Sequence, residues 1–404
     1  MKKYSVILLI LLFTINVFSK ERVTIPRNNT HLREGPGCFY PVIKVLSKGS
    51  KIYKLDQSDK WLQVKWQHNV GWVSRNVFEN CKSENLLDQK IKTDTSRISQ
   101  ASMSGAVRGF AEKYIAQTGG NPGFVEQYNK KLITPEEYLS FKNNTFQNRN
   151  PKKLEKRYGL PQESNITQIT WQDEKIGLAV ASRIAQKGVI KDSNKVKYIN
   201  FVGTLVLEKS SGYQHSVKFY IVKEPNSAAY CTPGGIFFLS QGLIDKINNE
   251  AELACLLGHE LAHFIRKHGQ LELQNRETRI KASHAFQKLE EETSSKNTSK
   301  LENLANNLYE AACKKRQLKY EYEADRLGVI YAYRAGYNPN TYVNLLKRLS
   351  DNSEIDYENF ESEWESFYLD KRIKKVKAFI SNQIERKEAL DVKNKERFID
   401  FMHP

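Results

Sequence analysis

The stretch "CLLGHELAHFIRKHG", residues 255–269, sets two histidines four residues apart with a glutamate beside the first. On an α-helix, residues four apart share a face, so His259 and His263 can approach one metal ion. Glu260 lies one position further round, close enough to act on a water molecule held between them. Burying two imidazoles and a carboxylate in an apolar helix without a metal is costly. The stretch therefore favours a zinc-binding catalytic helix over a charged surface helix that happens to contain histidines.

The start of this helix is marked in the sequence. Asn249 is a good N-cap residue, and Glu252 stands three positions later, which is the spacing of a capping box. Cys255 precedes His259 by one helical turn. We interpret Cys255 as a small buried residue, since free cysteine is among the most buried residue types.

A third zinc ligand is predicted downstream, in the amphipathic helix "KYEYEADRLGVIYAYRAGYNP" at residues 319–339. Glu321 and Asp325 are four residues apart and share a face, while Glu323 points elsewhere. One carboxylate can bind zinc while the other accepts a hydrogen bond from a ligand histidine. The spacing by itself leaves open which of the two binds.

Residues 165 to about 375 resemble the HtpX-like and CAAX-prenyl-protease-like zinc metallopeptidases, which are gluzincins. Four stretches carry the resemblance: "AAYCTPGGIFFLSQGLI", "NEAELACLLGHELAHFIRKHG", "YEYEADRLG" and "RAGYNPNTYVNLLKRL". The resemblance implies an α+β fold, with a mainly helical, zincin-type metallopeptidase domain over residues 165–404 and a small edge sheet for substrate.

The same resemblance implies a role for each polar residue. His259, His263 and Glu321 match the ligands of one Zn²⁺ ion per chain. Glu260 matches the general base, and Asp325 matches an acid that supports the catalytic centre. In such a site zinc acidifies water, and the carboxylate takes the proton and passes it to the leaving amine.

The sequence departs from the family pattern in two places. Ala228 stands where the family has asparagine before its substrate-edge strand. Ser366 and Phe367 replace a His-Pro pair whose histidine is thought to stabilise the oxyanion, although Arg372 after them fits the pattern. Tyr368, or another tyrosine, is a candidate for the missing oxyanion partner.

Between the two zinc helices, residues 281–319 form a highly charged insert with a helical pattern. We interpret it as a solvated helical arm, with a lid over the cleft as the alternative. His268, before the insert, matches a histidine that is common in the family but is not a ligand. His284, within it, is interpreted as a surface residue.

Residues 22–81 alternate apolar and polar residues between glycine-containing turns, which predicts a small β-barrel. "HLREGPGCFYPVIKVLSKGSKI" and "WLQVKWQHNVGWVSRNVF" resemble a bacterial Src-homology-three-like domain, a family whose members often bind cell-wall peptides or proteins. Four aromatic residues either line a ligand groove or pack in the core: Tyr40, Trp61, Trp66 and Trp72. A disulfide between Cys38 and Cys81, near the two ends of this unit, is plausible.

The first twenty residues combine a basic start with an apolar run, as in a secretory signal peptide or an N-terminal anchor. The protein is therefore predicted to lie outside the cytoplasm, in the periplasm, in the cell envelope or secreted. Residues 82–164 are polar and predict a linker with short helices.

The net charge of +17 is spread along the chain rather than gathered in one block. We interpret it as a solvated basic surface, compatible with peripheral membrane association, and expect no nucleic-acid partner.

These features together predict a secreted or periplasmic zinc metalloendopeptidase. Its substrates would be extended or misfolded envelope polypeptides, added as a strand along "AAYCTPGG". Two alternatives stay open: a zinc peptidase that acts on cell-wall peptides, and a non-catalytic wall-binding protein.

Overall fold

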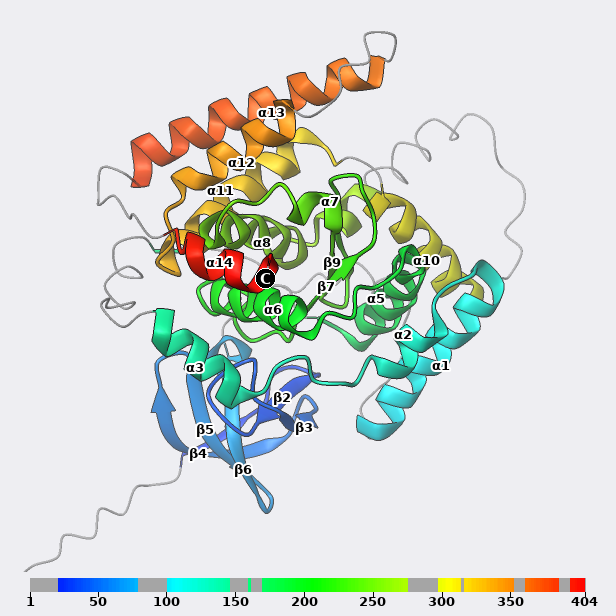
Figure 1. The fold of residues 1–404 in the computed structure, drawn as a ribbon. Helices are drawn as coiled ribbons and strands as arrows, with labels where there is room; N and C mark the ends of the chain where they lie inside the picture. The colour runs from blue at the N-terminus through cyan, green and yellow to red at the C-terminus, as the bar shows by residue number, and fades with distance from the viewer. Residues whose placement is uncertain are drawn as a thin grey trace, which may run out of the picture.

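The computed structural model describes residues 21–78, 100–145, 159–160, 169–274, 297–313, 316–351, 360–384 and 393–403. An N-terminal antiparallel sheet lies against a mainly helical body that contains a second sheet (Figure 1). The fold is thus of the α+β class, as predicted. Within the described residues, no helix combines the length and the hydropathy that crossing a membrane requires. The apolar run at residues 1–20 lies outside the described part of the chain.

The N-terminal sheet has six strands in the order β1-β4-β5-β6-β2-β3. They are β1 (Arg22–Thr24), β2 (Thr30–Arg33), β3 (Val42–Leu46), β4 (Lys51–Ser58), β5 (Trp61–Trp66) and β6 (Asn69–Ser74). The prediction of a closed barrel is wrong, because the edge strands β1 and β3 do not pair in the described residues. β2 meets β6 through the single pair Arg33 and Trp72, and an irregularity after Leu32 bends β2 away from a continuous ladder.

The aromatic residues of this sheet do not form one groove. Trp61 is buried, and its ring meets Tyr213 of the helical body edge to face at 5.8 Å. Trp66, Trp72 and Tyr40 are half-buried. Trp61 is therefore a core residue of the contact between the two units, and a ligand groove on the other three stays a prediction.

Cys38 is a free, buried thiol, so the predicted disulfide with Cys81 is not formed. The loop after β2 turns Cys38 into the core of the helical body, where it joins the same hydrophobic cluster as Tyr138. Cys81 itself lies outside the described residues.

The helices of the body account for most of the remaining described chain. They are α1 (Gln100–Thr118), α2 (Pro122–Gln127), α3 (Pro135–Thr145), α5 (Trp171–Ile184), α6 (Ser193–Glu208), α7 (Gln241–Ile244), α8 (Glu250–Ile265), α10 (Asn297–Cys313), α11 (Leu318–Arg334), α12 (Asn340–Asp351), α13 (Phe360–Phe379) and α14 (Lys395–Met402). The helices α1, α2 and α3 fall within the predicted connecting segment, residues 82–164.

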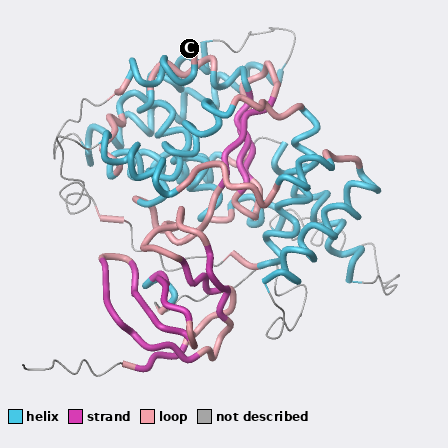
Figure 2. Tube along the Cα trace, turned by 60° about the horizontal axis from the view of Figure 1, so that its bottom comes forward, coloured by secondary structure: helices cyan, strands magenta, loops and turns pink. Residues whose placement is uncertain are grey.

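A three-stranded sheet divides the core of the body into two layers (Figure 2). β7 (Lys218–Val222) runs parallel to the central strand β9 (Ile236–Ser240), and β8 (Ala229–Cys231) pairs antiparallel to β9 at the edge. Alternate strand residues face opposite sides. Phe219 and Phe237 pack with α6, α8 and α11, whereas Tyr220 and Phe238 pack with α1, α5 and α10.

The insert between the zinc helices is not a solvated arm where it is described. α10 buries Leu304, Leu308 and Ala311 in the layer shared with α5. Its apolar stripe at helical spacing explains this burial, because such a stripe packs against a core. Residues 275–296, which include His284, lie outside the described chain.

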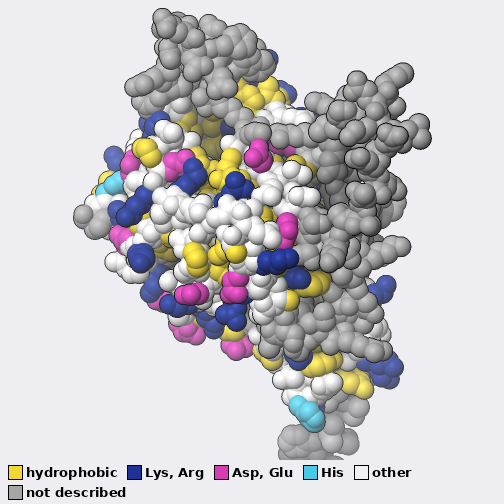
Figure 3. Space-filling model, turned by 90° about the vertical axis from the view of Figure 1, so that its right-hand side faces the viewer, with side chains coloured by type: hydrophobic (Ala, Val, Ile, Leu, Met, Phe, Trp, Pro, Cys, Tyr) yellow, Lys and Arg dark blue, Asp and Glu magenta, His cyan; other side chains and the backbone are white. Residues whose placement is uncertain are grey.

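Charge on the face shown in Figure 3 is mixed, with basic and acidic side chains interspersed over the described atoms. The absence of a nucleic-acid partner stays a prediction.

Candidate metal centre

The candidate centre is built where α8 and α11 cross in close contact. A Cβ atom added to Gly258 would lie 2.8 Å from the carbonyl oxygen of Gly328, and one added to Gly328 would lie 2.5 Å from the backbone nitrogen of His259. Real Cβ atoms do not come so close, so both positions require glycine. This contact brings Glu321, two turns before Gly328, within reach of the histidines.

α8 begins at the predicted residue. The side chain of Asn249 accepts a hydrogen bond from the backbone N–H of Glu252 at 3.0 Å. The carboxylate of Glu252 bonds the N–H of Asn248 rather than that of the cap, so the capping box is only half formed. Every residue of α8 is buried, including both histidines and Glu260.

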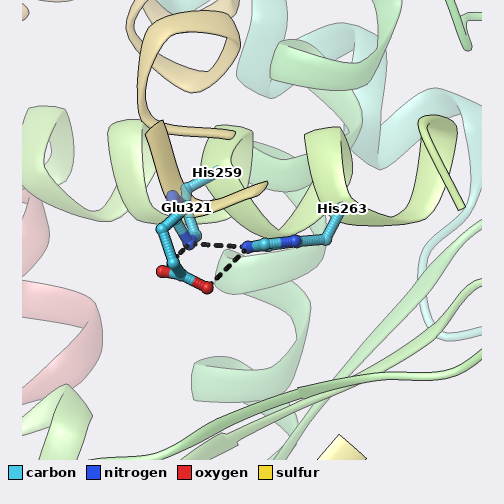
Figure 4. A group of neighbouring side chains, drawn as sticks. All are labelled: His259, His263 and Glu321. Carbon is cyan, nitrogen blue, oxygen red and sulfur yellow. Dashed lines mark hydrogen bonds and ion pairs between the residues drawn. The ribbon is translucent and has the colours of Figure 1, made fainter. Parts of the chain in front are cut away.

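Three side chains meet at one point between the helices (Figure 4). His259 Nε2 and His263 Nε2 are 3.0 Å apart. The two carboxylate oxygens of Glu321 lie 3.5 Å from His259 Nε2 and 3.4 Å from His263 Nε2. The structure thus brings together the three residues predicted as metal ligands.

These separations fit a tetrahedral zinc ion. Donors about 2.1 Å from one ion at tetrahedral angles are separated by roughly 3.4 Å. The three observed distances lie within a few tenths of an ångström of that value. Two imidazoles and one carboxylate, with a fourth position left for water, are a donor set of catalytic zinc sites. Glu321 is the carboxylate that reaches both imidazoles, and Asp325 lies behind His259.

Asp325 orients His259 from the side away from the centre. Its Oδ1 lies 2.9 Å from His259 Nδ1, and the carboxylate also accepts hydrogen bonds from Arg372 and from the Tyr342 hydroxyl. Arg372 further contacts Glu321 at 2.9 Å. One guanidinium therefore holds both Glu321 and Asp325, which keeps their geometry fixed relative to the histidines.

His263 has a different support. Its Nδ1 lies 2.9 Å from His268 Nδ1, and His268 Nε2 lies 3.3 Å from a carboxylate oxygen of Glu323. Glu323 in turn accepts a hydrogen bond from Arg266 at 2.7 Å. His268 therefore contacts His263 without reaching the centre. Glu323 points away from the centre and links His268 to Arg266.

The ionisation of the acids suits these positions. Burial would raise the pKa of Glu321, but the Arg372 guanidinium and the two imidazoles hold it well below its usual range. Burial is likewise outweighed at Asp325, where Arg372 and His259 lower the pKa to about 2. Burial raises the pKa of Glu260, and the charges of His259 and Arg316 act against that rise. Glu321 is thus ionised, while the raised pKa of Glu260 gives its carboxylate a stronger affinity for a proton.

The oxyanion candidate Tyr368 is engaged elsewhere. Its hydroxyl donates a hydrogen bond to the backbone carbonyl of Arg316. The side chains of Ser366 and Phe367 lie outside the described residues. At the substrate edge, the backbone N–H of Ala228 donates to Ser240 Oγ at 2.8 Å, and β8 leaves its outer side unpaired in the described sheet.

Sequence reasoning missed several residues of this centre. Tyr342 and Glu323 were not assigned contacts, and Arg372 was noted only as a match to a family pattern. The glycines carried a readable signal, since a glycine inside a buried helix marks a close backbone approach. The hydroxyl of Tyr342 reaches Asp325 from another helix, α12, and no local sequence pattern predicts this hydrogen bond.

Comparison with known proteins points the same way as this geometry. Residues 196–383, just under half of the chain, match the model of Peptidase family M48. The matched segment contains all five predicted site residues. The match indicates a metallopeptidase, which is a hydrolase, and peptidases of this family are zinc-dependent.

Several of the matched relatives carry the same name. The chain is 26% identical over 175 residues to the beta-barrel assembly-enhancing protease of Yersinia pestis, which covers 42% of this chain and 35% of the relative. It is 24% identical over 169 residues to that of Escherichia coli (strain K12), covering 40% and 34%. The chain thus spans about a third of the length of these relatives.

A third relative has another activity in its name. The chain is 29% identical over 89 residues to a putative N-acetylmuramoyl-L-alanine amidase of Bacillus subtilis (strain 168). This match covers 22% of the chain and 17% of the relative.

Proposed function

We propose that this protein is a zinc-dependent metalloendopeptidase that hydrolyses extended or misfolded polypeptides of the cell envelope. The observation that carries the proposal is the meeting of His259, His263 and Glu321 at tetrahedral spacing inside an apolar core. Three polar donors that face one another there are satisfied by a divalent cation better than by each other.

The residues of the chain divide the work of peptide hydrolysis. Zinc in such a site supplies Lewis acidity, which polarises a carbonyl group and acidifies water. Glu260 takes a proton from the attacking water and returns it to the amine that leaves. Asp325 and Arg372 keep His259 and Glu321 in place, and the apolar walls of α8 exclude bulk water.

The substrate is proposed to bind as an added strand along β8. An unpaired sheet edge offers backbone N–H and C=O groups to any extended peptide, so it selects for unfolded chains over folded ones. The similarity to two proteases named for enhancing beta-barrel assembly supports envelope proteins as substrates. The apolar run at residues 1–20 supports a location outside the cytoplasm.

Metal analysis tests the centre directly. We expect about one zinc per chain in the purified protein and little in the variant His263→Ala, because each ligand contributes strongly to affinity. Elemental analysis after dialysis measures both. Equal zinc in the two proteins would place the ion elsewhere and end the proposal.

Hydrolysis of casein tests the chemistry. Glu260→Gln keeps the shape of the side chain but removes the base, so we expect a 10²- to 10⁴-fold loss in rate with the zinc content unchanged. Both quantities are measured on the same preparation. A wild type that holds zinc but leaves casein intact, or a Glu260→Gln variant of full activity, would contradict a peptidase mechanism at this centre.

The similarity to a putative amidase keeps a second candidate in view, a zinc peptidase that acts on cell-wall peptides. Purified peptidoglycan given to the same preparation separates the two. Release of wall peptides without casein cleavage would favour this candidate. Binding to peptidoglycan without cleavage of either substrate would favour a non-catalytic wall-binding protein.

A further inference from the structure

A small pocket opens beside the metal centre, on the side of His263. Its walls are the end of the edge strand at Cys231 and Thr232, the turn after α8 at Gly269, and the end of α10 at Leu308. Arg316 closes it. The pocket therefore lies between the proposed substrate strand and a metal ligand, where a side chain next to the scissile bond would point.

Arg316 is held in this position by its backbone neighbours. Its carbonyl accepts the hydrogen bond from the Tyr368 hydroxyl, and the N–H of the next residue, Gln317, donates to the Glu272 carboxylate at 2.7 Å. Glu272 is itself buried. Both hydrogen bonds act on the peptide group that joins Arg316 to Gln317, so the backbone is held on the C-terminal side of Arg316.

The charge of the pocket is unbalanced. No carboxylate belongs to its lining. Lys267, the other cation there, has its ammonium group 3.1 Å from the buried carboxylate of Asp173. Within the described residues, Arg316 has no ion pair of its own. Its charge acts on the carboxyl of Glu260, which is not part of the pocket lining. A half-buried guanidinium without an ion pair attracts an anionic group, since it offers several N–H donors at fixed angles.

The size of the pocket limits what can enter. Its cavity volume is about 30 Å³, and a site for one water needs about 10–15 Å³ on this measure. A carboxylate with one or two methylenes fits that space, and an aromatic ring does not. The lining also includes the apolar side chains of Leu308, Phe264 and Pro233, which suit those methylenes.

We propose that Arg316 is a specificity-determining residue, which binds a substrate carboxylate in this pocket and so directs cleavage next to acidic residues. The inference rests on the proposed peptidase function and adds a substrate class to it. A carboxylate can come from an aspartate or glutamate side chain or from the C-terminus of the substrate, and the test separates these sources.

The test uses fluorogenic peptides of one parent sequence with a single cleavage site mapped by mass spectrometry. In each peptide, one position next to the cleavage site is replaced by glutamate, glutamine or lysine. Each peptide is made in two forms, with a free and with an amidated C-terminus. For the wild type we expect kcat/KM for glutamate to exceed that for glutamine by 10- to 100-fold at one position. A preference for free C-termini alone would assign the pocket to the terminal carboxylate. Equal rates for all three side chains and both termini would overturn the inference.

Variants of the arginine decide whether its charge is the cause. R316Q should reduce the preference for glutamate to within about three-fold, and R316E should shift it towards lysine. The matched control is K319Q, which removes an exposed cation three residues along the same segment. Equal loss on all peptides in R316E, with no change of preference, would show a purely structural role.

Binding gives a readout that does not need turnover. In the background of Glu260→Gln, fluorescence anisotropy of labelled peptides should show the same preference for glutamate, lost in the double variant with R316E. Acidic selectivity in binding without hydrolysis by the wild type would refute the peptidase function and leave the pocket assignment intact. Hydrolysis by the wild type without selectivity for acidic peptides would support the peptidase function and refute the assignment of the pocket.

Discussion

The metal centre and the contact between the two units both bury many polar groups, but they satisfy them differently. At the contact, Arg33 of β2 donates to the carbonyls of Cys38, Tyr40 and Gln214 and to Ser216 Oγ, at 2.9 to 3.3 Å. At the centre, the Nε2 atoms of two histidines and the oxygens of Glu321 face one another, and Arg372 contacts the same carboxylate at 2.9 Å.

The difference shows how structure and function can be told apart in a buried polar cluster. At the contact, the two terminal nitrogens of Arg33 donate to separate acceptors, and the result is adhesion between the units. Burial and the charge of Arg33 also lower the pKa of His31 to about 3, so this imidazole is neutral and can accept from Arg33 at 3.1 Å. The nitrogen and oxygen atoms that converge at the centre would be satisfied by the proposed cation.

The largest effect is expected from Arg33→Met, which breaks the contact but not the centre. Several buried carbonyls lose their donor, so we expect a loss of about 3 kcal/mol in the free energy of unfolding. Urea unfolding followed by tryptophan fluorescence measures it, with Arg75→Met as the exposed control. Zinc content and casein hydrolysis should stay at wild-type levels. Loss of zinc in Arg33→Met would contradict the view that the contact between the units is structural and separate from the metal centre.

Next in size is Gly328→Ala, which acts on the centre. The new Cβ would lie 2.5 Å from the His259 nitrogen, so α8 and α11 must separate. Overpacking of this kind costs about 2 kcal/mol, and zinc affinity should fall as Glu321 withdraws. Competition with a chromogenic chelator measures that affinity. Gly105→Ala, at an open helical site, is the control and should stabilise slightly. Unchanged affinity in Gly328→Ala would show that the close helix contact does not position the ligand.

The smallest effect concerns Glu174, which lines the cavities at the contact between the units. Burial, with the nearby charge of Asp173, raises the pKa of its carboxyl to about 7. The folded state thus favours the protonated form, and this contribution is complete below about pH 4.5 and lost as the pH rises through 7.

Glu174→Gln should therefore flatten this dependence. Between about pH 5 and pH 8, the wild type should lose on the order of 1 kcal/mol relative to the variant. Chemical unfolding across this range measures the difference, with the exposed Glu136→Gln as control. Parallel curves for wild type and Glu174→Gln would show that the carboxyl is solvated rather than buried.

The sequence predicted much of the centre because its signals are local. His259, Glu260 and His263 lie on one turn of one helix, and Glu321 and Asp325 lie on one turn of another. Helical periodicity then dictates which of them share a face. The burial of α8 follows equally from its run of leucines, and its start follows from Asn249. An alternating pattern also predicted strands for the N-terminal unit, because the strand period of two is local too.

The tertiary structure alone decided what depends on distant partners. Closure of a barrel depends on two edge strands that are distant in the sequence, so the N-terminal sheet stays open although its alternating strand pattern was predicted. Cys38 became a core residue because the helical body covers its loop, and α10 became part of a layer because α5 and the sheet offer it an apolar face. The convergence of the two zinc helices depends on contact between Gly258 and Gly328, seventy residues apart in the sequence. Hydrophobic periodicity in the sequence predicts which residues face the core. Only tertiary packing determines which residues of other elements they contact there.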